Sequence, residues 1–218
     1  EKNLNYGELT FWYWLWKNEL SSIPNHTWVG FSQYRRHWYK SKTKEYYNNN
    51  IFENVLQKIP QEWESYETIL GEKINTREVK LMKLLKYGKM ALFKNPKSII
   101  AKYRNIKFNF DMMHGAGILN DAIELLDDEN RNSFRNYCMN ETSFNPVNMF
   151  VCKSKEKINE FFSCLFTWLD KCENKFGLNL RGYGNIRRYA FLSERFMPYW
   201  FNKNTSVLEW PIIFHDLR

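Results

Sequence analysis

Glycine is scarce in this sequence, with 9 residues in 218, which argues against nucleotide binding through a glycine-rich loop. The 4 cysteines form no CxxC pair and have no metal-ligand spacing with the 4 histidines, so reduced thiols of a cytoplasmic protein are the simplest interpretation. No apolar run approaches the roughly 18 residues that a membrane-spanning helix needs. Neither a signal peptide nor an internal repeat is visible.

Aromatic residues and positive charge are the two excesses of the composition. Aromatics make up 18% of the chain, more than a small core needs, so we expect some rings to line a groove that stacks on sugars or bases. The formal net charge of +8 predicts attraction to polyanions, anionic lipid surfaces or phosphorylated substrates, and charge alone does not separate these three partners.

Helical and strand patterns alternate along the chain. They predict helices over residues 1–20, 51–59, 120–126, 129–139, 155–175 and 187–201, and strands over residues 28–31, 67–70, 147–152 and 208–214. Asn5 is the predicted cap of the first helix. The alternation favours the α/β class, with a mixed, mainly parallel sheet flanked by helices in a single domain spanning residues 1–218.

The strand over residues 28–31 leads to two adjacent guanidinium groups, Arg35 and Arg36. Ligands of α/β sheets bind at the carboxyl ends of strands, and paired arginines suit a multiply charged oxyanion such as a diphosphate. The competing interpretation is a solvated strand end with no ligand.

Residues 76–104 are rich in both lysine and apolar residues, and we interpret them as a basic helical insertion. Lys80, Lys83, Lys86 and Lys89 recur every three positions, and Pro96 begins a second basic helix. Such helices can lie on an anionic membrane, although many charged helical faces are only solvated.

Polar residues elsewhere mark further candidate sites. They are Glu8 and Thr10 near a helix N-terminus, His114 and Asp121 around Gly115-Ala116-Gly117, Asn148 in a buried strand, and Arg187, Arg188 and Glu194 on a late helix. A buried Asn needs a partner, which is either the protein itself or a substrate hydroxyl.

Four motifs, in order along the chain, resemble the domain-of-unknown-function family 4422. They are NLNYGELTFWYWLWKN at residues 3–18, VGFSQYRR at 29–36, NMF at 148–150 and RYAFLSER at 188–195. Members of that family look like glycosyltransferases of capsule, exopolysaccharide and O-antigen synthesis with a GT-A type fold. The resemblance implies transfer of a sugar from a nucleotide-diphosphate donor, with a UDP-sugar first among the donors, to a glycan or lipid-linked glycan.

The resemblance also suggests residue roles. We expect Glu8, Thr10, Gln33, Tyr34, Arg35 and Arg36 to bind the donor, and Asn148, Trp14, Arg187 and Arg188 to bind the acceptor or sugar. Glu194 is the expected general base of an inverting transfer, with His114 and Asp121 as the other candidates. Arginines would replace the metal of Asp-x-Asp enzymes, so no metal is required, although manganese or magnesium is not excluded.

The chain departs from the family pattern in three places. Gln33 stands where the family has histidine, the family has a further strand and helix before the Asn3 motif, and residues 76–104 look inserted. We expect the preceding region to be missing from this chain. The expected location is the cytoplasm, at most peripheral to the inner membrane face, with no nucleic acid as partner. The alternative from a different class is a non-catalytic module that binds an anionic glycan or RNA.

Overall fold

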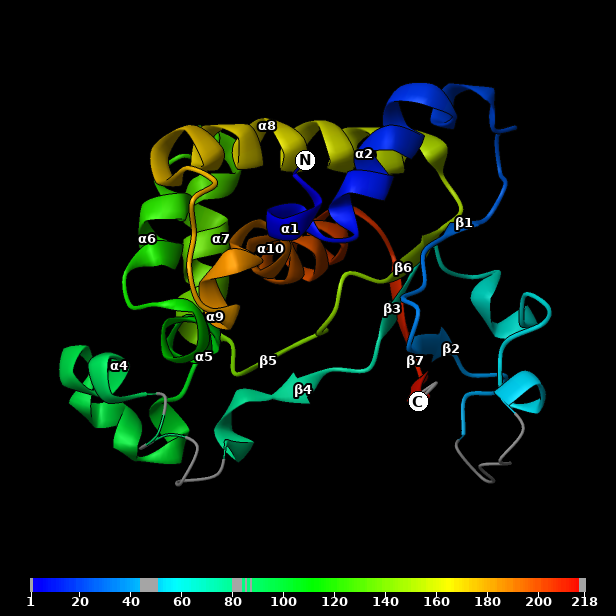
Figure 1. The fold of residues 1–218 in the computed structure, drawn as a ribbon. Coiled ribbons are helices and arrows are strands. Elements are labelled where there is room, and N and C mark those ends of the chain that lie inside the picture. The colour runs from blue at the N-terminus through cyan, green and yellow to red at the C-terminus, as the bar shows by residue number, and fades with distance from the viewer. Residues whose placement is uncertain (1, 44–50, 80–83, 85, 87, 216–218) are drawn as a thin grey trace.

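The computed structural model describes residues 2–43, 51–79, 84, 86 and 88–215 (Figure 1). Lys80 and Lys83 of the predicted basic helix lie outside these residues. The N-terminal half contains α1 (Asn3–Tyr6), α2 (Leu9–Asn18), β1 (Val29–Gly30), β2 (Arg36–Trp38), β3 (Thr68–Gly71), β4 (Ile74–Asn75) and α4 (Lys89–Lys94). The C-terminal half contains α5 (Ile106–His114), α6 (Ile118–Ile123), α7 (Asp128–Asn140), β5 (Ser143–Phe144), β6 (Phe150–Cys152), α8 (Lys155–Phe176), α9 (Tyr183–Ile186), α10 (Arg188–Asn204), β7 (Val207–Trp210) and β8 (Ile212–Phe214). Short 3-10 turns η1 (Leu20–Ser22), η2 (Ile51–Glu53), η3 (Gln61–Trp63), η4 (Thr76–Glu78), η5 (Pro96–Ile99) and η6 (Ala101–Tyr103) connect them.

The central sheet has the strand order β1-β6-β3-β7. Strand β6 is antiparallel to both β1 and β3, whereas β3 and β7 are parallel. Three of these four strands therefore run in one direction and β6 runs against them. The predicted α/β class with a mixed, mainly parallel sheet is confirmed.

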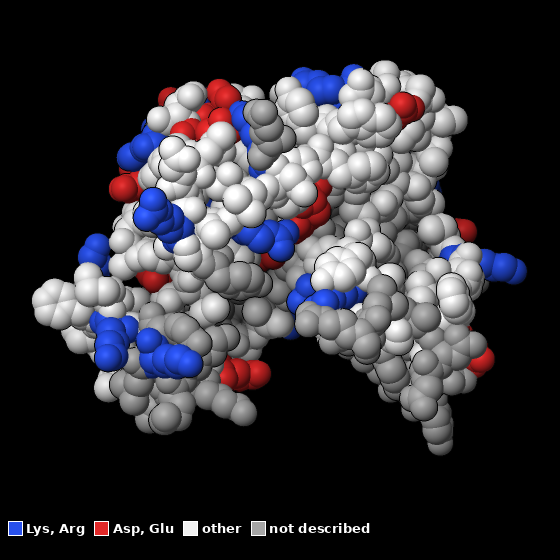
Figure 2. Space-filling view, in the orientation of Figure 1, with Lys and Arg blue, Asp and Glu red and all other residues white. Residues whose placement is uncertain are grey.

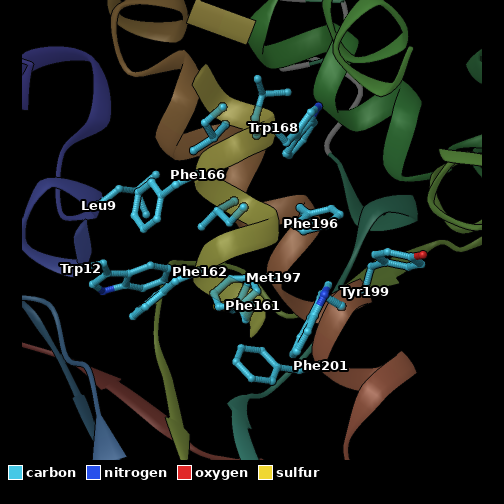
Figure 3. Close-up of a cluster of buried hydrophobic side chains, with 14 of the residues drawn as sticks. Leu9, Trp12, Phe161, Phe162, Phe166, Trp168, Phe196, Met197, Tyr199 and Phe201 are labelled. Carbon is cyan, nitrogen blue, oxygen red and sulfur yellow. The ribbon is translucent and has the colours of Figure 1, made fainter. Parts of the chain in front are cut away.

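Side chains of β6 alternate between two cores because successive residues of a strand point to opposite faces of the sheet. Phe150 and Cys152 enter the larger core, while Val151 enters a smaller core with Trp63 and Trp210. The larger core lies between the sheet and helices α2, α8 and α10, and Figure 3 shows its aromatic side chains clustered around α8. Both faces of the sheet are thus buried.

Four predicted elements differ in the structure. The second basic helix predicted to begin at Pro96 is two short 3-10 turns, η5 and η6. The helix predicted over residues 1–20 is broken at Gly7, which has φ +56°, and Asn5 donates to the carbonyls of Leu178 and Ile186 instead of capping. Residues 51–59 contain only the turn η2, and the final strand is two strands in different sheets. Pro211 separates these two strands because a proline has no N–H for a ladder.

Candidate active site

Glu8 lies at the break between α1 and α2 and binds side chains from three distant parts of the chain. Its Oε1 accepts hydrogen bonds from Gln33 Nε2 at 3.0 Å and from Asn148 Nδ2 at 2.9 Å. Its Oε2 forms an ion pair with Arg187 Nη2. The carboxylate therefore holds together the start of α2, the turn after β1, the segment before β6 and the junction of α9 and α10.

Local backbone geometry places these groups. Gly7 adopts a positive φ that few other residues tolerate, so the chain turns sharply and presents Glu8 at the start of α2. Val147 also has a positive φ, of 65°, directly before Asn148. For a β-branched residue this conformation is strained, and such strain is concentrated at functional sites.

Gln33 connects Glu8 to a second arginine. Gln33 Oε1 accepts a hydrogen bond from Arg36 Nη1 at 2.9 Å, and the backbones of Gln33 and Arg36 pair across a tight turn. Strand β1 does not run directly into the arginines, as the sequence suggested, because this turn intervenes. Among the described residues no carboxylate pairs with Arg36, so its charge is not neutralised by an ion pair.

Glu194 and Arg195 lie on α10, where the Glu194 carboxyl is near the charges of Glu8 and Arg187. Glu194 Oε2 is 3.0 Å from Arg195 Nη1, and Arg195 also donates to Asn109 Oδ1 at 3.1 Å. Burial raises the pKa of the Glu194 carboxyl, the Arg195 charge opposes this, and the nearby Glu8 charge raises it further. A carboxyl group with a raised pKa is well suited to proton transfer near neutral pH.

Figure 2 shows this face of the molecule hollowed at its centre, where acidic and basic side chains meet. We call Glu8, Gln33, Arg36, Asn148, Arg187, Glu194 and Arg195 the Glu8 cluster. Asn148 Oδ1 is buried and has no hydrogen-bond partner within the described part of the chain, while its Nδ2 is also bonded to the Ala190 carbonyl at 3.1 Å. An unpaired buried acceptor is costly unless a ligand or water supplies a donor.

The other predicted site residues lie apart from the Glu8 cluster or serve local contacts. His114 is buried, 2.9 Å from the Gly184 carbonyl and stacked on Phe191. Burial, with the positive charge of Arg195, lowers the pKa of His114 to about 3, so its ring is neutral at physiological pH. Asp121 is exposed on α6.

Several predicted donor and acceptor residues also lie apart from the Glu8 cluster or serve local contacts. Thr10 donates to the Gly7 carbonyl at 2.8 Å, and it lines a separate cavity of about 660 Å³ between α2 and α8. Tyr34 is 70% exposed with the Arg35 guanidinium over its ring. Trp14 is half-exposed and stacks on Phe11, and Arg188 is buried over the Phe176 ring.

Sequence reasoning did not single out Arg195 as a member of the site or Asn109 as its hydrogen-bond partner. Arg195 is buried, and its guanidinium lies 4.3 Å from the centre of the Phe144 ring. The signal was present in the adjacent Glu194-Arg195 pair, which has large apolar residues on both sides in the chain, because buried charges are normally paired. Nothing in the sequence around Asn109 indicates its role, which depends on how α5 packs against α10.

Both carboxylates of the Glu8 cluster are engaged by guanidinium groups. Within the described residues no group of three or more His, Cys, Asp or Glu side chains is gathered as metal ligands would be. The positive charge of this site comes from arginines. Among the described helices none is long and apolar enough to cross a membrane.

Comparison with solved structures identifies the fold. A solved structure described as a WbbM bifunctional glycosyltransferase in its apo form is similar, with a TM-score of 0.69 at 20% identity. The match covers 99% of this chain and 37% of that chain, so this chain spans little more than a third of that protein. At this identity the match shows the fold, which is therefore that of a glycosyltransferase structure.

The family follows from a separate comparison. The model described as Domain of unknown function (DUF4422) matches residues 1–205, and the chain belongs to this family. A comparison with curated proteins found no match.

Proposed function

We propose that this chain is a glycosyltransferase that moves a sugar from a nucleotide-diphosphate donor, a UDP-sugar, to a glycan or lipid-linked glycan. The product class is cell-surface polysaccharide such as capsule or O-antigen, and the reaction takes place in the cytoplasm at the inner membrane face. The observation that carries the proposal is the Glu8 cluster, in which Arg36, without a carboxylate partner among the described residues, and the ion-paired Arg187 lie beside the partly buried Glu194 carboxylate on a glycosyltransferase fold.

Each group of the cluster has a chemical role in this proposal. Glu194 accepts the proton of the acceptor hydroxyl, whose oxygen attacks the anomeric carbon while the bond to the diphosphate oxygen breaks. Arg36 and Arg187 stabilise the negative charge that develops on the leaving diphosphate. Asn148 Oδ1 accepts a hydrogen bond from a sugar hydroxyl, which supplies the missing donor.

The test begins with thermal shifts against a panel of nucleotide-diphosphate sugars, each with manganese and with a chelator. Binding to the folded state raises the melting temperature. We expect a shift that survives chelation and that disappears in Arg36→Ala. Arg181→Ala is the matched control, because Arg181 is an exposed arginine before α9, and it should keep the shift.

Glu194→Gln separates binding from chemistry. This variant should retain the donor shift and lose transfer by about 10²- to 10⁴-fold, the usual contribution of a general base. Glu194 pairs with Arg195 of its own helix, so a purely structural role is the competing explanation. Turnover near wild type in Glu194→Gln would reject the assignment, and no shift with any donor would reject the function.

A further inference from the structure

Residues 79–110 contain no Asp or Glu, but they contain eight lysines and one arginine. Their formal charge of +9 exceeds the +8 of the whole chain, so the remaining residues together carry −1. The positive charge of this protein is therefore concentrated in one segment, around α4, η5 and η6. In Figure 1 this segment lies on the opposite side of the molecule from β2, whose first residue is Arg36 of the Glu8 cluster.

Large apolar side chains project from the same segment. They are Met90, Phe93, Ile99, Ile100 and Tyr103, of which Phe93 is 84% exposed. The exposed lysines Lys89, Lys94, Lys97 and Lys102 lie among them in the chain. Figure 2 shows basic side chains beside uncharged ones over this region. Exposed apolar patches of this kind mark interaction sites, because monomeric proteins seldom leave them in water.

The buried Arg104 side chain fixes the backbone beneath this surface. Its buried guanidinium donates to the carbonyls of Ser98 at 3.0 Å, Val79 at 2.9 Å and Ile99 at 2.9 Å. Thr76 Oγ1 in turn donates to the Arg104 carbonyl at 2.7 Å. The apolar side chains at positions 99 and 100 are thus displayed by a fixed backbone, and they do not fold back onto the small core of Leu84, Ala91, Phe108 and Met112.

We propose that the surface formed by α4, η5 and η6 docks on an anionic lipid bilayer. Lysines attract anionic headgroups, and apolar side chains enter the boundary between headgroups and acyl chains. RNA fits less well, because three of the five exposed apolar side chains, Met90, Ile99 and Ile100, offer neither stacking faces nor hydrogen bonds to bases. The proposal goes beyond the transferase activity and depends on none of the residues of the Glu8 cluster.

Co-sedimentation with lipid vesicles tests the surface directly. Wild-type protein should sediment with vesicles of phosphatidylcholine and phosphatidylglycerol and stay in solution with phosphatidylcholine alone. Lys89→Glu/Lys97→Glu should weaken binding by roughly thirtyfold or more, since each cation near the surface contributes about 1 kcal/mol. Lys42→Glu/Lys58→Glu changes the net charge equally at exposed positions outside the surface and should bind nearly as wild type.

A second set of variants tests how much the exposed apolar side chains contribute to vesicle binding. Phe93→Ser/Ile99→Ser should also lose most binding, whereas Phe52→Ser, at another exposed phenylalanine, should not. Unchanged thermal unfolding of each variant would show that folding is intact. Equal losses in the two charge-reversal variants, or equal sedimentation with neutral vesicles, would overturn the proposal. If the protein bound a polynucleotide and not vesicles, and Lys89→Glu/Lys97→Glu lost that binding, the partner of this surface would be a nucleic acid and not a membrane.

Discussion

At the scale of single residues, Glu8 determines the arrangement of the candidate site. One carboxylate accepts hydrogen bonds from Gln33 and Asn148 and pairs with Arg187. The Glu8 side chain is 19% exposed and that of Arg187 is 39% exposed, so water weakens the ion pair without removing it. The value of the contact is as much in positioning as in stability.

Replacing Glu8 with Gln removes the charge and leaves Arg187 without its partner. We expect a loss of about 1 kcal/mol in the free energy of unfolding, discounted for solvent screening, and loss of the donor-induced thermal shift. Glu124→Gln is the control, since Glu124 pairs with Arg135 at 2.6 Å on the surface and should contribute little. Chemical denaturation and thermal shift measure the two effects. If Glu8→Gln bound the donor as well as the wild-type protein does, Glu8 would not be part of the donor site.

His114 predicts a pH dependence of stability. Its pKa is lowered to about 3 from the ordinary 6.5 by burial and by the Arg195 charge. Between these values the unfolded chain binds a proton that the folded protein does not, so this contribution is complete above pH 6.5 and is lost as pH falls toward 3. The slope is about 1.4 kcal/mol per pH unit.

Urea unfolding at pH 7.5 and 5.5 tests this contribution. Wild type should lose about 1 kcal/mol more than His114→Gln between the two pH values. His26→Gln serves as the control, because His26 is exposed. Identical pH dependence in wild type and His114→Gln would mean that the folded protein protonates this ring readily.

At the scale of elements, the junctions matter more than the helices they separate. Gly7 divides α1 from α2, the turn from Gln33 to Arg36 divides β1 from β2, and Arg187 lies between α9 and α10. Each junction delivers a polar side chain to the same place. The helices supply the apolar faces whose packing fixes the positions of these junctions.

Gly7→Ala and Gly177→Ala form a matched pair for this idea. Both glycines have a positive φ, which is +56° at Gly7 and +71° at Gly177, so alanine should cost about 1–3 kcal/mol at either position. A Cβ at Gly7 would also collide with the Arg187 guanidinium, whereas none of the described atoms lies near a Cβ at Gly177. Only Gly7→Ala should therefore abolish the donor-induced shift. Equal effects of the two variants on that shift would refute the link between this junction and the site.

At the scale of the whole molecule, aromatic packing joins the sheet to the helices. Phe161 of α8 packs near Trp12 of α2, Phe150 of β6, and Trp200 and Phe201 of α10. All five side chains are buried, as Figure 3 illustrates for Phe161, Trp12 and Phe201. Much of the high aromatic content thus serves the core, and less of it lines a groove than the composition suggested.

Phe161→Ala should leave a cavity in this core. We expect a loss of about 3–5 kcal/mol in the free energy of unfolding and a fall in melting temperature of about 10 °C for a chain of this size. Phe93→Ala, at the 84% exposed phenylalanine of α4, should change stability by less than about 0.5 kcal/mol. Calorimetry compares the two, and similar melting temperatures would contradict this account of the core.

The α/β class and the long helices α8 and α10 were determined by the sequence, because apolar periodicity is a local property of the chain. Strands β2, β4 and β5 and helix α5 were not predicted. The polar candidates Glu8, Gln33, Arg36, Asn148, Arg187 and Glu194 were also recognisable as residues. The break at Gly7 and the split at Pro211 were not predicted, although both residue types are known to interrupt elements.

Tertiary structure decided which candidates belong together. Glu8 and Arg187 are 179 positions apart in the chain, and no periodicity relates residues at that separation. His114 and Asp121 were the second choices after Glu194 in sequence, and packing buries His114 as a neutral ring and leaves Asp121 on the surface. Proximity and burial set the charge and chemistry of such groups, and both arise only when the two halves of the chain pack around the common core.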